Sequence, residues 1–185
     1  MEIEEKTLVG CAGGPTKIEV AHISMSKLAI HKGDVFADIG CGTGLMSLLA
    51  SEWAGRIYAV DDRDEAVEAA KKNLAGLQVP VEIIKGEASQ VLKQLPMIDC
   101  AFVGGTRNIE KTLEALVESL DGRAVINAVR LETAARTVSK LRELNILKEV
   151  IHVQLSRGYE LAGEVVFKPI NPVYVVVADT RLRDG

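Results

Sequence analysis

The sequence predicts an α/β domain in which a mostly parallel sheet carries helices on both faces. Five short apolar runs alternate with segments whose apolar residues recur at the spacing of an α-helix. A glycine-rich turn follows the first of these runs, and two further strand-like runs close the chain with no helix between them. The alternation predicts parallel strands, and the closing pair predicts a hairpin whose last strand runs antiparallel to the others.

The predicted elements follow one another in a regular order. Residues 1–14 are expected to be irregular, and Pro15 suits the start of a helix that continues to about residue 31. Leu45, Leu48 and Leu49 predict a helix directly after the glycine-rich turn. We expect strands over 35–39, 57–60, 81–84, 98–103 and 124–129, helices over 64–74, 90–95, 109–120 and 132–144, and final strands over 147–155 and 173–178 joined by a loop that contains Arg157 and Gly158.

The run Asp38-Ile39-Gly40-Cys41-Gly42-Thr43-Gly44 is the most informative motif. Glycine suits a sharp strand-to-helix turn, because it accepts unusual backbone angles and lets a ligand approach the backbone closely. The third glycine comes one position earlier than in the dinucleotide fingerprint, where Leu45 stands here. This spacing is instead typical of class I methyltransferases, which bind S-adenosylmethionine (SAM). SAM has no pyrophosphate, so the loop must admit a methionine moiety and an adenosine.

Two acidic residues complete this predicted cofactor site. Asp61 ends the second strand, where its carboxylate is expected to accept two ribose hydroxyls. Asp38 is expected to contact either the loop or the ammonium group of SAM. Cys41 fits a small filler of the loop better than a nucleophile. A nicotinamide cofactor, or a turn without a ligand, is the alternative for the loop considered alone.

The closing hairpin supports the same fold. Five strand–helix units followed by a hairpin give the seven-stranded, Rossmann-like sheet of class I methyltransferases, whereas a dinucleotide fold more often continues with strand–helix units. We therefore expect one domain over 1–185, with an N-terminal segment and helix over 1–33, a core over 34–145 and a closing hairpin region over 146–185.

Composition and charge narrow the functional classes. The formal net charge of −4 argues against nucleic acid as a partner, and no apolar run is long enough to cross a membrane. Cys11, Cys41 and Cys100 fit neither a disulfide framework nor a zinc site, so we expect a cytoplasmic location and no bound metal. The fourth strand ends in Gly104-Gly105-Thr106 and not in the Asn-Pro-Pro-Tyr motif of amino-group methyltransferases.

Several motifs outside the glycine loop are shared with one methyltransferase family. They are Gly14-Pro15-Thr16-Lys17-Ile18-Glu19, Tyr58-Ala59-Val60-Asp61, Gly86-Glu87-Ala88, Gly104-Gly105, Asn127-Ala128-Val129, Ser156-Arg157-Gly158 and Asn171-Pro172. With these motifs the chain resembles, over nearly its whole length, the cobalt-precorrin C15-methyltransferases (decarboxylating) of cobalamin biosynthesis. The resemblance implies methylation of C15 of cobalt-precorrin-6B to give cobalt-precorrin-7, with loss of the C12 acetate carboxylate, on the anaerobic route to vitamin B12.

The motifs also suggest which residues form the site. The expected cofactor contacts are Thr16, Asp38, Gly40, Cys41, Gly42, Thr43, Gly44, Asp61, Glu87 and Ala88. The substrate implied by the resemblance is a polycarboxylated tetrapyrrole, whose carboxylates need cations. The candidates for its pocket are Lys17, Gly104, Gly105, Arg107, Asn127, Arg130, Glu132, Arg157 and Lys168, with Arg107 and Arg157 favoured because both lie beside glycine-containing turns. Each of these cations also fits a solvated surface charge, and Asn127 and Glu132 also fit caps of the next helix.

The resemblance further implies a homo-oligomer, for which a tetramer is one form, and a separate C5-methyltransferase as a partner enzyme. Two other functions stay open at this point. One is a SAM-dependent methyltransferase that acts on an RNA base, as tRNA adenine N1-methyltransferases do with a similar core. The other is a non-catalytic subunit that binds SAM without turnover.

Overall fold

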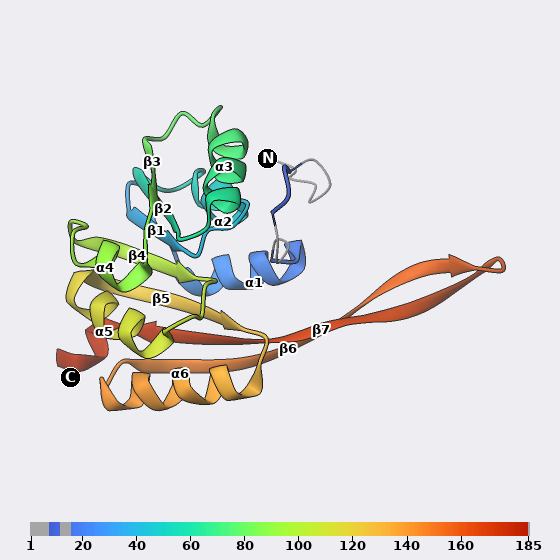
Figure 1. The fold of residues 1–185 in the computed structure, drawn as a ribbon. Coiled ribbons are helices and arrows are strands. Elements are labelled where there is room, and N and C mark those ends of the chain that lie inside the picture. The colour runs from blue at the N-terminus through green and yellow to red at the C-terminus, as the bar shows by residue number, and fades with distance from the viewer. Residues whose placement is uncertain (1–7, 12–15, 185) are drawn as a thin grey trace.

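Seven strands form one sheet in the order β3-β2-β1-β4-β5-β7-β6 (Figure 1). The computed structural model describes residues 8–11 and 16–184, so Pro15 and most of the predicted irregular segment lie outside the described residues. The strands are β1 (Val35–Ile39), β2 (Arg56–Asp61), β3 (Val81–Lys85), β4 (Ile98–Val103), β5 (Leu120–Ala128), β6 (Leu147–Leu161) and β7 (Glu164–Asp179). The helices are α1 (Ile18–Leu28), α2 (Leu45–Ala50), α3 (Asp64–Leu74), α4 (Ala88–Leu92), α5 (Ile109–Ser119), α6 (Leu131–Glu143) and the 3-10 helix η2 (Thr180–Asp184).

The strand directions confirm the predicted fold class. β1 pairs in parallel with β2 and β4, while β2 pairs in parallel with β3 and β4 with β5. β7 runs antiparallel to both of its neighbours, β5 and β6. The sheet is therefore mostly parallel with one antiparallel strand inserted near its edge, which is the Rossmann-like methyltransferase topology.

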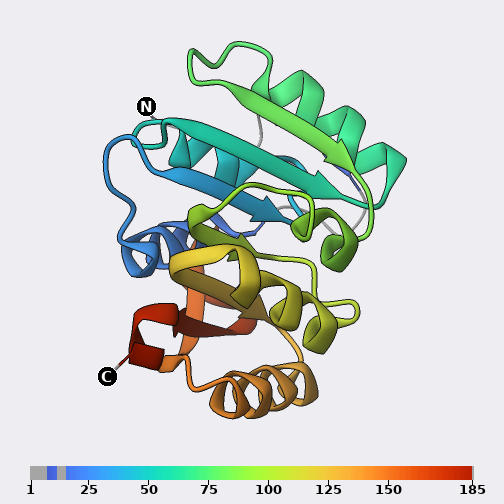
Figure 2. The same cartoon turned by 90° about the vertical axis from the view of Figure 1, so that its left-hand side faces the viewer.

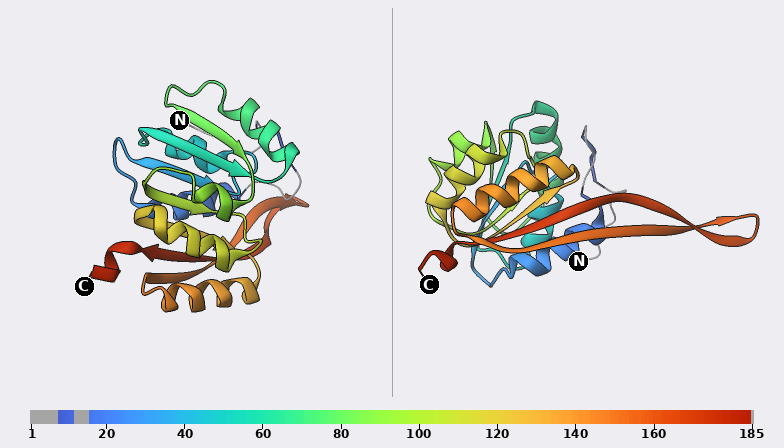
Figure 3. Two further views of the ribbon diagram at one scale, coloured as in Figure 1. Left: turned by 60° about the vertical axis from the view of Figure 1, so that its left-hand side comes forward. Right: turned by 90° about the horizontal axis from the view of Figure 1, so that it is seen from below.

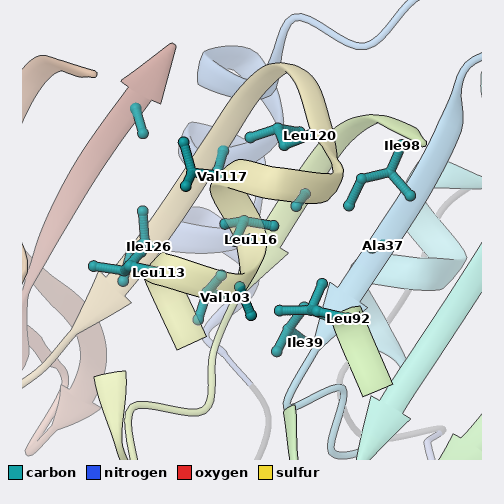
Figure 4. Packing of buried hydrophobic residues seen from close by; sticks show 14 of the residues in the cluster. Ala37, Ile39, Leu92, Ile98, Val103, Leu113, Leu116, Val117, Leu120 and Ile126 are labelled. Atoms are coloured by element: carbon teal, nitrogen blue, oxygen red, sulfur yellow. The ribbon is translucent and has the colours of Figure 1, made fainter. Parts of the chain in front are cut away.

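Three helices cover each face of the sheet (Figure 2). Alternate side chains of one strand point to opposite faces, so Phe36 packs with α1 and α2 while Ala37 and Ile39 pack with α4 and α5. Figure 4 shows the second of these cores, in which Leu113 and Leu116 of α5 lie against the sheet. Burial of each such aliphatic side chain contributes about 1.5–3 kcal/mol. Because helices cover both faces, a ligand can approach this sheet at the ends of its strands. In parallel α/β sheets, ligands bind at the carboxyl ends.

The closing hairpin is longer than the sequence predicts. β6 and β7 form one antiparallel ladder, from the pair Leu147–Ala178 to the pair Leu161–Glu164, with two shifts of register, and Arg157 stands opposite Lys168 within it. The predicted loop around Arg157 and Gly158 is therefore wrong, because these residues lie in a strand. The two strands leave the body of the domain as a twisted arm (Figures 1 and 3). The turn at its tip falls on Ala162 and Gly163, whose φ angles of 53° and 84° suit a two-residue hairpin turn.

Most element boundaries agree with the prediction, and α3 and β4 agree at both ends. The short helix expected over 90–95 begins earlier, at Ala88, because the side chain of Glu87 caps it by accepting a hydrogen bond from the Gln90 amide. Within the described ranges, no helix is long and apolar enough to span a membrane.

Candidate cofactor site

The carboxyl ends of β1, β2 and β4 meet at one edge of the sheet, at the point where the strand order reverses. The glycine loop, residues 40–44, follows β1 at this edge. The amides of Gly40 and Cys41 both donate to the Val60 carbonyl, at 2.8 and 3.0 Å, and the Gly104 amide donates to the Ile39 carbonyl at 2.8 Å. These bonds fasten the loop between the ends of the two neighbouring strands.

Gly40 and the double glycine after β4 lie in direct backbone contact. A Cβ atom on Gly40 would lie 2.3 Å from the Gly105 nitrogen and 2.6 Å from its Cα, and the φ angle of Gly40 is +73°. A side chain at Gly40 would therefore be strained by its backbone angle and would also displace the second loop. Close packing of the two loops explains both glycine motifs.

A cavity of about 350 Å³ opens beside the glycine loop. A smaller cavity of about 60 Å³ adjoins it, because Gly40, Asp61, Asp62, Gly105 and Arg107 line both. The remaining residues of the larger cavity are Thr16, Asp38, Cys41, Gly42, Thr43, Leu45, Met46, Arg63, Phe102, Gly104 and Thr106, and those of the smaller one are Ile39, Val60, Gly86, Glu87, Ala88 and Asn108. Together the two cavities contain every predicted cofactor residue except Gly44, which instead forms the N-terminal cap position of α2.

Asp38 lies at the floor of the larger cavity and is fully buried. Its Oδ2 accepts hydrogen bonds from the amide of Ser47 at 3.0 Å and from the hydroxyl of Ser47 at 2.7 Å. Its Oδ1 has no hydrogen-bond partner among the described residues. Burial raises the pKa of the Asp38 carboxyl to about 7, against the hydrogen bonds from Ser47 that lower it. A buried oxygen without a partner is costly, so this position favours a ligand that donates a hydrogen bond.

Asp61 presents its carboxylate at the junction of the two cavities. Oδ1 accepts hydrogen bonds from the backbone amide and Nε of Arg63, at 3.1 and 3.0 Å. Oδ2 accepts from the Gly42 amide and from Nη2 of Arg63, both at 3.0 Å. Burial raises the pKa of the Asp61 carboxyl, but these hydrogen bonds outweigh it and the pKa lies below its ordinary value. Asp61 is therefore held as an anion.

The N-terminus of α4 borders the smaller cavity through Glu87 and Ala88. Oε2 of Glu87 accepts hydrogen bonds from the Ser89 hydroxyl at 2.6 Å and from the Gln90 amide at 3.1 Å. The bond from Ser89 is the main cause that lowers the pKa of the Glu87 carboxyl. Cys41 stays a filler of the loop, since burial raises the pKa of its thiol well above the usual range and disfavours a nucleophilic role.

Arg107 is the one predicted substrate cation that lines the cavities, together with Gly104 and Gly105. Nη1 of Arg107 lies 2.7 Å from Oδ2 of Asp62, which extends from the end of β2. This pair bridges the mouth of the site. The side chain of Arg107 is 76% exposed, so it remains accessible to a ligand outside the cavity.

The other predicted substrate residues lie elsewhere: Lys17 at the N-terminal cap position of α1, Asn127 in β5, Arg130 and Glu132 at the start of α6, and Arg157 and Lys168 on the arm. Asn127 exchanges hydrogen bonds with Ser24 of α1. Arg157 forms a two-bond pair with Glu19, at 2.8 and 2.6 Å. In the part of the chain that the structure describes, no side chain caps α6, so neither Asn127 nor Glu132 serves as its cap.

Six lining residues of the larger cavity were not predicted: Leu45, Met46, Asp62, Arg63, Phe102 and Thr106. A sequence signal existed for some of them. Arg63 and Asp62 directly follow the acidic end of β2, and Thr106 follows the double glycine. Phe102 carried no such signal, because its place in β4 is equally typical of a core residue.

Comparisons with known proteins identify the family of this chain. The family model for the precorrin methyltransferase domain matches residues 11–179. A protein of Methanosarcina mazei, named "Probable cobalt-precorrin-6B C(15)-methyltransferase (decarboxylating)", is 48% identical over 176 residues, which cover 92% of this chain and 96% of that protein. A protein of Halobacterium salinarum with the same name is 40% identical over 89% of this chain and 88% of its own.

Solved structures show the same fold over nearly the whole chain. The crystal structure of precorrin 8W decarboxylase from Methanobacterium thermoautotrophicum has a TM-score of 0.91 and 30% identity, and covers 96% of this chain and 99% of that one. A precorrin-6y C5,15-methyltransferase from Geobacter metallireducens has a TM-score of 0.90 and 29% identity, with 97% and 98% coverage. A tRNA (m1A58) methyltransferase from Aquifex aeolicus, at 17% identity, shares the fold alone. The chain belongs to the precorrin methyltransferase family, a family of SAM-dependent enzymes.

Proposed function

We propose that this chain methylates C15 of cobalt-precorrin-6B and removes the carboxylate of the C12 acetate, giving cobalt-precorrin-7. The observation that carries the proposal is a cavity that combines the glycine loop, the unpartnered Oδ1 of Asp38 and the Asp61 carboxylate. The substrate is taken from the relatives, whose names specify cobalt-precorrin-6B and position 15.

The residues at the cavity fit SAM. Oδ1 of Asp38 is placed to accept a hydrogen bond from an ammonium group, and the charge of that group favours the ionised carboxyl. Asp61 would take the ribose hydroxyls in place of its side-chain hydrogen bonds from Arg63, and Glu87 and Ala88 border the space for the adenine. SAM, when bound, supplies a methyl group activated by a sulfonium. A volume of about 350 Å³ suits a ligand of this size, so the much larger tetrapyrrole must lie over the mouth of the cavity.

Cations lie at and near that mouth. Arg107 lines the cavity and follows the end of β4. Thr16 also lines the cavity, and Lys17 follows it at the start of α1. Arg157 is paired with Glu19 of the same helix, so it would bind a substrate carboxylate only in exchange for that pair. Arginine binds carboxylates through two parallel hydrogen bonds, so the exposed Arg107 suits a polycarboxylated ring. Lys168, Arg130, Asn127 and Glu132 line neither cavity, and they stay candidates for substrate binding.

The chemistry requires positioning more than proton transfer. Alignment of C15 with the methyl group is worth about 7–11 kcal/mol in favourable cases. The new bond forms between C15 and the methyl carbon, and the electron pair of the broken bond stays on sulfur. Decarboxylation breaks the bond between the acetate methylene and its carboxylate, and the conjugated ring accepts the electron pair. A pocket from which water is excluded favours this loss of charge.

We also propose that the chain forms a homo-oligomer through its arm. Tyr159, Leu161, Val165 and Phe167 are 48%, 57%, 66% and 71% exposed along the two strands of the arm. Such apolar side chains on a two-stranded ribbon are typical of a surface that packs on another protein. A second copy of the chain is proposed to pack on this arm. Sedimentation of the Phe167→Ser variant tests this, and we expect the mass of the assembly to fall.

The three thiols are free, which is consistent with the expected cytoplasmic location. A separate C5-methyltransferase remains the expected partner enzyme.

Mass spectrometry of a reaction with SAM and cobalt-precorrin-6B tests the proposal. We expect a product that has gained one methyl group and lost one CO2. Asp61→Ala should abolish SAM binding in calorimetry, whereas Asp121→Ala, at the opposite edge of the sheet, should bind normally. Methylation of tRNA instead of the tetrapyrrole would favour the RNA enzyme, and SAM binding without any turnover would favour the non-catalytic subunit.

A further inference from the structure

Residues 8–11 lie across the outer side of the glycine loop, although they are far from it in the sequence. The side chain of Leu8 packs on the apolar cluster of Cys41, Leu48, Ala59, Ala70 and Leu74, which lies beneath the loop. The Sγ atom of Cys11 comes within 3.8 Å of the position that a Cβ on Gly42 would occupy. We call this segment, residues 8–11, the strap.

One side chain joins the strap to the glycine loop. Asn73, at the end of α3, accepts a hydrogen bond from the Val9 amide through Oδ1 at 2.9 Å. Its Nδ2 donates to the Val9 carbonyl at 3.1 Å and to the Thr43 carbonyl at 2.8 Å. The carboxamide thus uses both of its N–H groups and one acceptor position, on partners that lie 64 and 30 residues away.

The loop needs such an external support, because it has few side chains of its own to hold it. Gly40, Gly42 and Gly44 all have positive φ angles, and glycine loses more freedom on ordering than any other residue. The next residue of α3, Leu74, already packs on Gly44, with its side-chain atoms 3.1–3.2 Å from a Cβ built there. Asn73 adds a hydrogen bond to the backbone of the same loop, from its Nδ2 to the Thr43 carbonyl.

We propose that Asn73 is a positioning residue of the cofactor site, which fixes the Thr43 carbonyl and fastens the strap across the glycine loop. It acts through the loop and does not contact the ligand. The preordered loop then binds SAM without a further loss of freedom, so Asn73 sets the affinity for SAM. This inference rests on the proposed function, since it assumes that SAM binds at the loop.

Asn73→Asp is the sharpest test, because it keeps the shape of the side chain and the bond from the Val9 amide. It removes both donated hydrogen bonds and places a carboxylate against two carbonyl oxygens. We expect the Kd and the KM for SAM to rise about tenfold, while kcat at saturating SAM stays within about twofold. A side chain that merely stabilises the fold would lower kcat through the folded fraction and leave KM unchanged. Lys72→Ala, on the exposed side of the same helix, is the control.

A second pair of variants tests the strap without touching Asn73. Val9→Pro removes the backbone N–H that donates a hydrogen bond to Oδ1 of Asn73. Val9→Ala keeps this N–H and shortens an exposed side chain. Calorimetry with SAM should show a Kd about threefold higher for Val9→Pro and an unchanged Kd for Val9→Ala. If Asn73→Asp does not fold, this pair decides the question.

The outcomes separate this inference from the proposed function. A SAM Kd within about twofold of wild type for both Asn73→Asp and Val9→Pro overturns the positioning role, even if the enzyme is active. Failure of the wild-type chain to bind SAM, or wild-type affinity in Asp61→Ala, would instead count against the cofactor assignment on which the inference rests.

Discussion

Gly40→Ala tests whether the contact between the glycine loop and the double glycine determines the site. The added methyl group would lie 2.3 Å from the Gly105 nitrogen and 3.3 Å from the Gly104 carbonyl carbon. Both are backbone atoms, which cannot rotate away as the end of a flexible side chain can. The φ angle of +73° costs alanine about 1–2 kcal/mol in addition. Together with an overpacking cost of about 1–3 kcal/mol, the expected destabilisation is about 2–5 kcal/mol.

Gly33→Ala is the matched control, because it separates the two costs. Gly33 has a φ angle of +95°, and a Cβ built on it meets nothing within 4 Å. Only the backbone cost of about 1–2 kcal/mol should appear there. Urea unfolding followed by circular dichroism measures both variants, and calorimetry measures their affinity for SAM. We expect Gly40→Ala to be the less stable of the two and to lose SAM binding. Equal stabilities, or unchanged SAM affinity in Gly40→Ala, would refute the reasoning.

Three further predictions follow from the charges. The folded pKa of Asp38, about 7, exceeds its unfolded value of 3.8, so this group makes stability fall as pH rises between these values and level off above them. Asp38→Asn should remove that slope in urea unfolding at about pH 5 and about pH 8. Asp179 is almost fully buried beside Arg123, Lys148 and Arg181, and its pKa is lowered because their hydrogen bonds outweigh the effect of burial. Asp179→Ala should therefore lower the free energy of unfolding by about 2 kcal/mol at neutral pH. This loss is smaller than that expected for an ion pair whose partners are all fully buried, and it should shrink as pH falls through the acid range. Arg107→Ala should raise KM for the tetrapyrrole several-fold and leave the Kd for SAM unchanged.

Much of the fold was predictable because burial imposes a regular pattern on the sequence. Strand β4 and helix α3 match their predicted ends, since each carries the apolar spacing of its own period. The cofactor residues were predictable for a related reason. Parallel strands bring their carboxyl ends to one edge, so the residues after β1 and β2 had to meet.

The arm was not predictable from the same signals. Alternating hydrophobicity arises where one face of a strand is buried. On the arm, neighbouring residues such as Phe167 and Lys168 point to opposite faces and are both exposed. Gly158, Pro169 and Pro172 then favour a loop in a reading of the sequence alone. Pairing across the ladder keeps these residues extended in spite of that preference.

Asn73 shows why part of the site also escaped prediction. It lies near the end of an amphipathic helix, where a polar residue is expected to face solvent. Its partners lie 30 and 64 residues away, and nothing in the spacing connects them. The sequence also does not show that the predicted cations lie in different places. The fold puts Arg107 at the cavity and Arg157 beside Glu19.

The pKa values of the two acids of the cavity are shifted in opposite directions, and this difference argues for SAM more strongly than the glycine spacing does. Asp61 is kept ionised by Arg63 and by backbone amides, while Asp38 is desolvated and, among the described residues, has hydrogen bonds from Ser47 alone. A pyrophosphate placed between them would add negative charge beside two carboxyls, which is unfavourable in a site shielded from water. An ammonium group at Asp38 has the reverse effect, because it stabilises the charge that burial opposes. The site therefore favours a ligand with an ammonium group at one end and hydroxyl donors near the other, as SAM has, over a dinucleotide that carries a pyrophosphate.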